Sequence, residues 1–152
     1  MILDVTDKKL LNLLQQDSKQ TTKQLSLQLN LSVTAVYERI KKLEKGKVIQ
    51  KYVAIINKHK IDKSFLVFCH IKLMQHSKDY VTTFEREVLK LEEVSECFHV
   101  SGEYDYILKV YVKDMDEYRE FMVKKLTAIK YIGSTQSTFA IEEVKNTTLI
   151  ST

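Results

Sequence analysis

Residues 99–106, HVSGEYDY, place a glycine between two β-rich runs. The run VSECFHVS covers residues 94–101, and DYILKVYV covers residues 105–112. Gly102 would allow a tight turn between them, because glycine adopts positive φ without a steric penalty. A hairpin here constrains the fold strongly, since it divides the second part of the chain into two halves of similar length. The loop's bare backbone groups also suit a zwitterionic small molecule, although a loop that only reverses the chain is the simpler interpretation.

Each half around this hairpin has the pattern of strand, helix and strand. The predicted elements are a strand at 65–73, a helix at 79–91, strands at 94–101 and 105–112, a helix at 115–129 and a last strand at 134–145. This β-α-β-β-α-β order is the ferredoxin-like arrangement, whose two helices cover one face of the sheet. The other face also carries apolar side chains, and nothing in the chain is left to cover it. We therefore expect a homodimer through this domain.

The first third of the chain has helical periodicity. The predicted helices cover residues 4–16, 22–30 and 32–46. Their candidate N-caps are Thr6 or Asp7, Thr21 or Thr22, and Ser32. The apolar stripe of the third helix is Val33, Val36, Ile40 and Leu43. Three helices with a short turn before the third are the helix-turn-helix pattern, in which the third helix enters the major groove of DNA.

The charge of the chain is divided unevenly. Residues 1–63 hold 13 Lys or Arg and 6 Asp or Glu, a net charge of +7, whereas residues 64–152 hold 11 and 14, a net charge of −3. A basic first part suits a polyanion such as double-stranded DNA, although a three-helix bundle with a solvated basic face is the alternative interpretation. The candidate DNA-binding residues on the third helix are Ser32, Thr34, Ala35, Tyr37, Glu38, Arg39, Lys41 and Lys42. Of these, we expect Lys42 to contact phosphate and Thr34 to contribute to base preference.

The segment VIQKYVAIIN, residues 48–57, is β-rich and predicts a strand that links two domains. The expected domains are a helix-turn-helix domain at 1–60, which includes this strand, and a ferredoxin-like effector-binding and oligomerisation domain at 61–152. The fold class is therefore α+β, with a winged-helix-like first domain, a linking strand and a βαββαβ domain.

Several classes of function are disfavoured. No run approaches the ~20 apolar residues of a membrane span, and the N-terminus lacks the pattern of a signal peptide, so we expect a cytoplasmic protein. Cys69, His70, Cys97 and His99 match no standard zinc spacing. In a ferredoxin-like sheet the third strand would also separate the two cysteines. We find no nucleophile paired with a base and no phosphate loop, so we expect neither an enzyme nor a bound cofactor or metal.

The chain resembles the Lrp/AsnC (leucine-responsive/asparagine regulator) family of transcription regulators over nearly its whole length. The matching segments are LDVTDKKLLNLLQQD, LSVTAVYERIKKLEKGKVIQKYVAIIN, LEEVSECFHVSGEYDYILKVYVKDMDEY and EEVK, and VSGEYDYILK is the most specific part. The resemblance implies a cytoplasmic DNA-binding protein that forms dimers and often octamers. Where relatives often have proline in the recognition helix, this chain has Val33 and Ala35, so its base preference cannot be carried over.

The resemblance also implies an amino-acid effector, bound where dimers meet. The residues that it implies are Gly102, Glu103, Tyr104 and Asp105 in the loop, and Thr135, Ser137 and Thr138 on the last strand. On this hypothesis Asp105→Ala would abolish ligand binding and leave the fold intact. Two alternatives remain open: an architectural DNA-organising protein without an effector, and a ligand-binding regulatory subunit of an enzyme.

Overall fold

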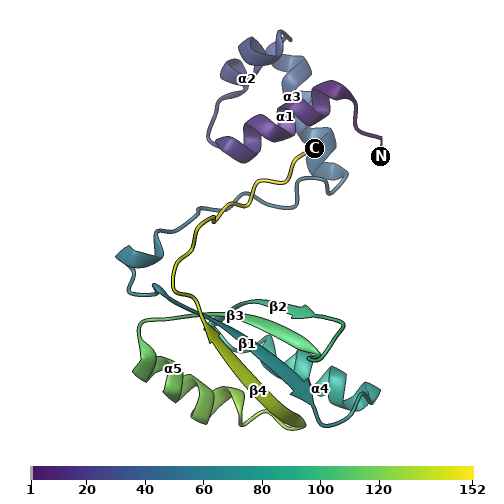
Figure 1. Cartoon of the computed structure of the whole chain (residues 1–152). Coiled ribbons are helices and arrows are strands. Elements are labelled where there is room, and N and C mark those ends of the chain that lie inside the picture. Colours follow the sequence, from purple (N-terminus) through teal and green to yellow (C-terminus); the bar gives the residue numbers. More distant parts are fainter. Residues whose placement is uncertain (1) are drawn as a thin grey trace. The chain divides into compact units, whose positions relative to one another are not determined.

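The computed structural model describes residues 2–152, which form two compact units (Figure 1). The first unit contains the chain up to Ile55 together with the C-terminal segment Val144–Thr152. The second unit is Ile56–Glu143. The chain therefore crosses between the units twice, once on each side of the second unit.

Three helices form the first unit: α1 (Val5–Gln16), α2 (Thr22–Leu29) and α3 (Val33–Lys45). Their core is made of Leu10, Leu11, Leu14, Leu25, Val36 and Leu43. Val33, predicted to belong to this apolar stripe, is 47% exposed, because it is the first residue of α3 and lies beyond the turns that face α1 and α2. Between α2 and α3, Asn30 has a φ of 53°, a left-handed conformation that asparagine tolerates.

Each of these helices begins after a capping residue. The Asp4 carboxylate accepts a hydrogen bond from the Asp7 N–H at 2.7 Å and caps α1, so the prediction of Thr6 or Asp7 as this cap was wrong. Asp7 instead completes a capping box, in which its carboxylate accepts from the Asp4 N–H. Thr21, one of two predicted candidates, caps α2, and Ser32 caps α3 as predicted.

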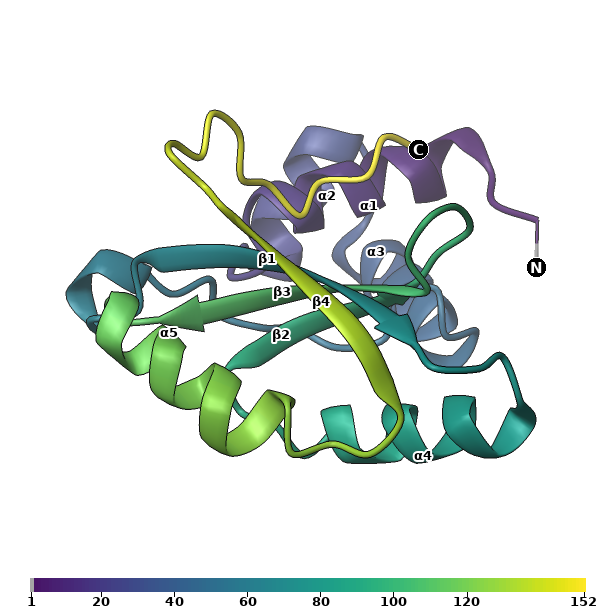
Figure 2. The ribbon, with the colours of Figure 1, turned by 60° about the horizontal axis from the view of Figure 1, so that its bottom comes forward.

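The second unit has the predicted βαββαβ order. Its strands are β1 (Phe65–Leu73), β2 (Val94–His99), β3 (Tyr106–Val112) and β4 (Ile132–Phe139), and its helices are α4 (Lys78–Val88) and α5 (Met115–Phe121). A π-helical turn, η2 (Met122–Leu126), extends α5. The four strands form an antiparallel sheet in the order β2-β3-β1-β4, and α4 and α5 cover the same face of it (Figure 2).

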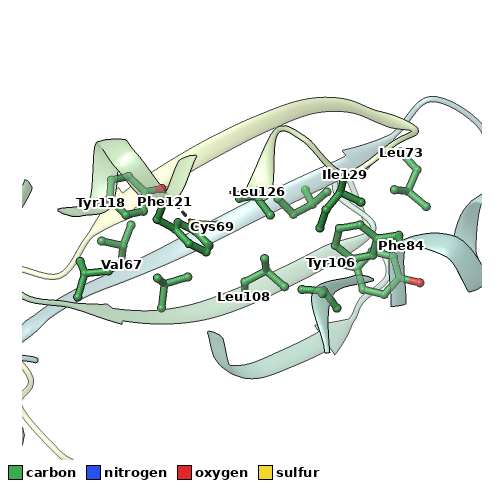
Figure 3. Close-up of a cluster of buried hydrophobic side chains, with 14 residues drawn as sticks. Val67, Cys69, Leu73, Phe84, Tyr106, Leu108, Tyr118, Phe121, Leu126 and Ile129 are labelled. Carbon is green, nitrogen blue, oxygen red and sulfur yellow. Dashed lines mark hydrogen bonds between the residues drawn. The ribbon is translucent and has the colours of Figure 1, made fainter. Parts of the chain in front are cut away.

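The core of this unit lies between that sheet face and the two helices (Figure 3). Alternate residues of β1 and β3 are buried there, among them Val67, Cys69 and Leu108. A buried polar contact lies in this core: the Tyr118 hydroxyl is 3.0 Å from the Cys69 sulfur and 2.5 Å from the Ser137 hydroxyl. These hydrogen bonds satisfy the hydroxyl, which would otherwise be costly to bury.

Helix α4, strand β2 and helix α5 with η2 end two or three residues earlier than predicted, and two other elements differ more. Residues 48–57 form no strand in the part of the chain that the structure describes. A strand needs a neighbour to complete its hydrogen bonds, and one copy of the chain supplies none here. The last strand is Ile132–Phe139, whereas 134–145 was predicted; it pairs only with β1, so it ends where β1 begins.

The second face of the sheet is less bare than predicted. It carries Leu66, Phe68, Ile107 and Tyr111, which alternate with the buried core residues. The turn η1 (Lys58–Lys60) reaches part of it, and the Lys58 Nζ lies 5.2 Å from the centre of the Tyr111 ring. We call the part of this surface that η1 does not reach, which includes Phe68 and Ile107, the open sheet face.

Candidate functional site

The exposed face of α3 presents polar and charged side chains. Thr34, Tyr37, Glu38 and Lys41 are all exposed and are spaced by three or four residues, so they lie on one side of the helix. The Lys41 ammonium lies 5.6 Å from the centre of the Tyr37 ring, a cation–π distance. We call these four residues the α3 face. It can offer hydroxyl, carboxylate, phenol and ammonium groups to a partner.

Two other predicted DNA-binding residues stabilise the start of the helix. The Ser32 hydroxyl accepts a hydrogen bond from the Ala35 N–H at 3.1 Å. Ala35 itself is half-buried. Ser32 therefore fixes the first turn of α3, and its side-chain oxygen is already engaged in the cap.

The structure ties Arg39 to α1. Its Nη1 lies 2.7 Å from a carboxylate oxygen of Asp4 and 2.5 Å from one of Asp7. Asp7 is 0% exposed, and the Lys42 ammonium lies 3.6 Å from its other oxygen. The hydrogen bond from the Asp7 N–H, and then Arg39, hold the pKa of the Asp4 carboxyl below its ordinary value. Arg39 therefore faces α1, whereas Lys41, Lys42 and Lys45 are exposed on α3.

The loop after β2 has the predicted turn. Gly102 has a φ of +128°, a conformation that side chains with a Cβ rarely adopt. Asp105 follows it and is 7% exposed. One oxygen of its carboxylate accepts a hydrogen bond from the Leu73 N–H at 2.7 Å, and the other lies 3.2 Å from Nδ1 of His76. Asp105 therefore anchors the loop to the end of β1, so the expectation that Asp105→Ala leaves the fold intact needs revision.

Tyr104 turns toward the open sheet face. Its hydroxyl donates a hydrogen bond to the side-chain oxygen of Gln136, and its ring centre lies 5.2 Å from that of His70. His70 and Gln136 are paired neighbours on β1 and β4. Neither was predicted from the sequence as part of the effector site, although strand alternation places Gln136 on the same face as the predicted Thr138.

The three predicted residues of β4 lie on two faces of the sheet. Ser137 points into the helix-covered core, where it meets Tyr118, and Thr135 pairs with the buried Ile71 on that same face. Thr138 pairs with Phe68 and belongs to the open sheet face. The structure thus brings Thr138 to the same face as Tyr104 and Gln136, and it separates Thr135 and Ser137 from them.

Comparison with known proteins assigns both units. Residues 3–44 match the AsnC-type helix-turn-helix domain, and residues 66–150 match the Lrp/AsnC ligand binding domain. The leucine-responsive regulatory protein of Escherichia coli is 40% identical over 143 residues, which cover 94% of this chain and 87% of that protein. The chain belongs to the Lrp/AsnC family. This family consists of transcription regulators and not of enzymes.

Solved structures of Lrp/AsnC regulators have the same fold. An AsnC family transcriptional regulator from Agrobacterium tumefaciens superposes with a TM-score of 0.94 at 34% identity, covering 97% of this chain and 96% of that one. A transcriptional regulator from Neisseria meningitidis, solved as a complex with L-Met, gives a TM-score of 0.92 at 31% identity, with coverage of 97% and 95%. Both similarities extend over the helix-turn-helix and the ligand-binding unit.

Three further observations concern residues 2–152 only. Within them, no three His, Cys, Asp or Glu side chains are placed so that they could hold a metal ion. As predicted, β3 separates the strands that carry Cys69 and Cys97, and both thiols are free. No helix in this range is long and apolar enough to cross a membrane.

Proposed function

We propose that this Lrp/AsnC chain is a sequence-specific DNA-binding transcription regulator that responds to a small amino acid. The observation that carries the proposal is the α3 face, an exposed polar surface on the third helix of a helix-turn-helix unit whose net charge is positive. Such a helix enters the major groove with residues near its N-terminus at the base edges. We propose a cytoplasmic location, which the family resemblance implies.

The side chains of α3 have different roles in this proposal. Thr34 and Glu38 lie near the start of the helix and reach base edges, where a carboxylate accepts from cytosine and a hydroxyl suits several bases. Lys41 contacts phosphate, and Tyr37 supports its ammonium. Ser32, Ala35 and Arg39 contribute to the interface by fixing the position of α3, because Ser32 caps the helix, Ala35 is half-buried and Arg39 is paired with Asp7. The exposed Lys42 can reach phosphate beside Lys41.

The proposed effector site is the loop at Gly102, Glu103, Tyr104 and Asp105, with Thr138 and Gln136 on the adjoining sheet face. Its backbone N–H groups suit a carboxylate, and its acidic side chains suit an ammonium, so a zwitterionic amino acid fits this chemistry. The Neisseria relative solved with L-Met supports an amino acid as the ligand class. Thr135 and Ser137 support this site from the core side.

We further propose a homodimer through the open sheet face, assembling into octamers. The face carries Phe68, Ile107 and the half-exposed Phe98, which a second copy would cover. The linking segment 48–57 would then find a strand partner in that copy, which would complete the hydrogen bonds that one chain leaves unmade. Size-exclusion chromatography with light scattering should therefore give a dimer or a multiple of it, and a monomer at micromolar concentration would exclude this assembly.

A thermal-shift panel of the twenty amino acids tests the effector. A ligand that binds only the folded protein stabilises it, by about 2.7 kcal/mol at a concentration 100 times its Kd. We expect at least one amino acid to raise the melting temperature of the wild-type protein. If DNA binding is present and none does, the architectural alternative replaces the proposed one.

Base recognition is tested with the variant Thr34→Ala. We expect it to reduce the ratio of affinities for specific and random duplex by about fivefold or more, since a lost base contact costs about 1–3 kcal/mol. Thr82→Ala, at an exposed threonine on α4, is the matched control. Equal losses on both duplexes would assign Thr34 a role other than base recognition.

A further inference from the structure

The C-terminal segment Val144–Thr152 returns to the helical unit and binds α1 (Figures 1 and 2). The side-chain amide of Gln15 donates a hydrogen bond to the carbonyl of Ile150 at 2.9 Å. The Ile150 N–H donates back to the amide oxygen of Gln15 at 2.8 Å. The Thr152 hydroxyl lies 3.0 Å from the side-chain oxygen of Asn12 and 3.3 Å from the Lys8 carbonyl.

These contacts use a surface of α1 beside its core side. Lys8, Asn12 and Gln15 follow one another at helical spacing and form a stripe at the edge of the buried leucine side, with Gln15 one turn after Leu11. A glutamine amide carries the same donor and acceptor as a peptide group, so Gln15 pairs with Ile150 as a neighbouring strand would. The Ile150 side chain is 74% exposed, so this surface recognises the backbone of an extended segment.

The same tail is also anchored on its other side. The Ala140 N–H donates to the Leu66 carbonyl at 3.1 Å, which fixes the chain just after β4. Glu143, the last residue of the second unit, is ion-paired with Lys58. Only Val144–Leu149 then lies between this anchor and Ile150. Six residues span at most about 20 Å, so the tail is a short connection.

We propose that the C-terminal tail is a second tether between the effector unit and the helix-turn-helix, held by the Gln15 amide. The linking segment 48–57 alone leaves the helical unit free to reorient, whereas a docked tail closes a loop and restricts it. The tether continues β4 into α1, and α1 holds Arg39 of α3 through Asp4 and Asp7. Through this connection, a ligand bound beside β4 can alter DNA binding by α3. This coupling rests on the proposed function.

Hydrogen exchange of the full-length protein tests the tether. Gln15→Ala removes both hydrogen bonds to Ile150 and keeps a good helix former, so α1 should remain folded. Gln16→Ala is the matched control, because Gln16 is an exposed glutamine on the same helix and no hydrogen bond of its side chain is seen among residues 2–152. We expect the Ile150 amide to exchange about fivefold faster or more in Gln15→Ala, and at the wild-type rate in Gln16→Ala. Equal rates in all three proteins would overturn the tether.

A second measurement tests the coupling. The ratio of duplex affinities with and without the stabilising amino acid is compared in the same three proteins. We expect this ratio to be at least about threefold closer to one in Gln15→Ala, a change within the usual range of coupling energies. The amino acid should still raise the melting temperature of the variant. An unchanged ratio would overturn the coupling role. If no amino acid stabilises the wild-type protein, the proposed function fails, and the exchange result still decides the tether.

Discussion

Two acidic residues that would be expected on the surface are buried in this chain and link distant segments. Asp7 is fully buried in the helical unit and neutralises two cations of α3. Asp105 is nearly buried beside Gly102 and accepts a backbone hydrogen bond from Leu73. The sequence indicates that each acid lies near a helix start or a turn. It does not indicate their partners Arg39 and Leu73, because these lie more than 30 positions away in the sequence.

Asp105→Ala should destabilise the second unit by about 1–3 kcal/mol, because it leaves the Leu73 N–H without its partner. Glu103→Ala, an exposed acid in the same loop, should change stability by no more than about 0.5 kcal/mol. Urea unfolding of the two variants gives both values. Equal stability of the two variants would contradict the anchoring role of Asp105.

The Asp4 carboxyl should make the stability of the helical unit depend on pH under acidic conditions. Its pKa is lower in the folded protein, so its contribution is present above the unfolded pKa, near 4, and is lost as the pH falls through the folded pKa. Asp4→Asn keeps a capping side chain but cannot titrate. Melting temperatures measured from pH 6 to pH 2 should therefore fall less steeply for Asp4→Asn than for the wild type. Parallel curves would show that Asp4 carries no such linkage.

The two thiols should be unreactive in the native protein. Burial raises the pKa of the Cys69 thiol, and burial, aided by Glu85, raises that of Cys97 to about 11. Because the thiolate is the reactive species, a disulfide reagent at pH 7.5 should label neither within minutes. Both should react in guanidinium chloride. Rapid labelling of the native protein would mean that one thiol is exposed and ionised.

At the scale of elements, the sequence predicts structure well where short stretches determine it and poorly where it depends on distant partners. The helices and the Gly102 hairpin depend on caps, apolar periodicity and a positive φ, all of which are written into short stretches of sequence. The strand predicted at 48–57 does not form, because it needs a partner strand that one chain does not contain. The division of Thr135 and Thr138 between two faces depends on where β4 pairs with β1, which the composition of the strand does not reveal.

The two valines near the start of α3 should differ sharply in their contribution to stability. Val36 is 0% exposed, whereas Val33 is half-exposed at the first turn. Val36→Ala should destabilise the helical unit by about 1–3 kcal/mol, through lost burial and the cavity that it leaves. Val33→Ala should cost less than about 0.5 kcal/mol. Chemical unfolding compares the two, and a similar loss for both would contradict the packing of α3.

At the scale of the whole molecule, the net charge is positive in the helical unit and negative in the sheet unit. The basic part contains the three helices and their α3 face, and the mildly acidic part contains the sheet and the proposed effector loop. Two chain segments join these parts, and the second of them ends on α1. On the proposed function, the helical unit binds DNA and the tail relays ligand binding at the other unit.

The salt dependence of duplex binding tests the DNA-binding claim most directly. The affinity of the full-length protein for a labelled duplex is measured by fluorescence anisotropy as salt rises from 50 to 300 mM. We expect tight binding at low salt and a linear fall of log K with log salt, because lysines on the basic unit displace counterions from phosphates. Lys41→Ala should reduce the slope by about one, whereas Lys130→Ala, an exposed lysine of the other unit, should not change it. No binding at 50 mM salt, or a slope near zero, would contradict the account.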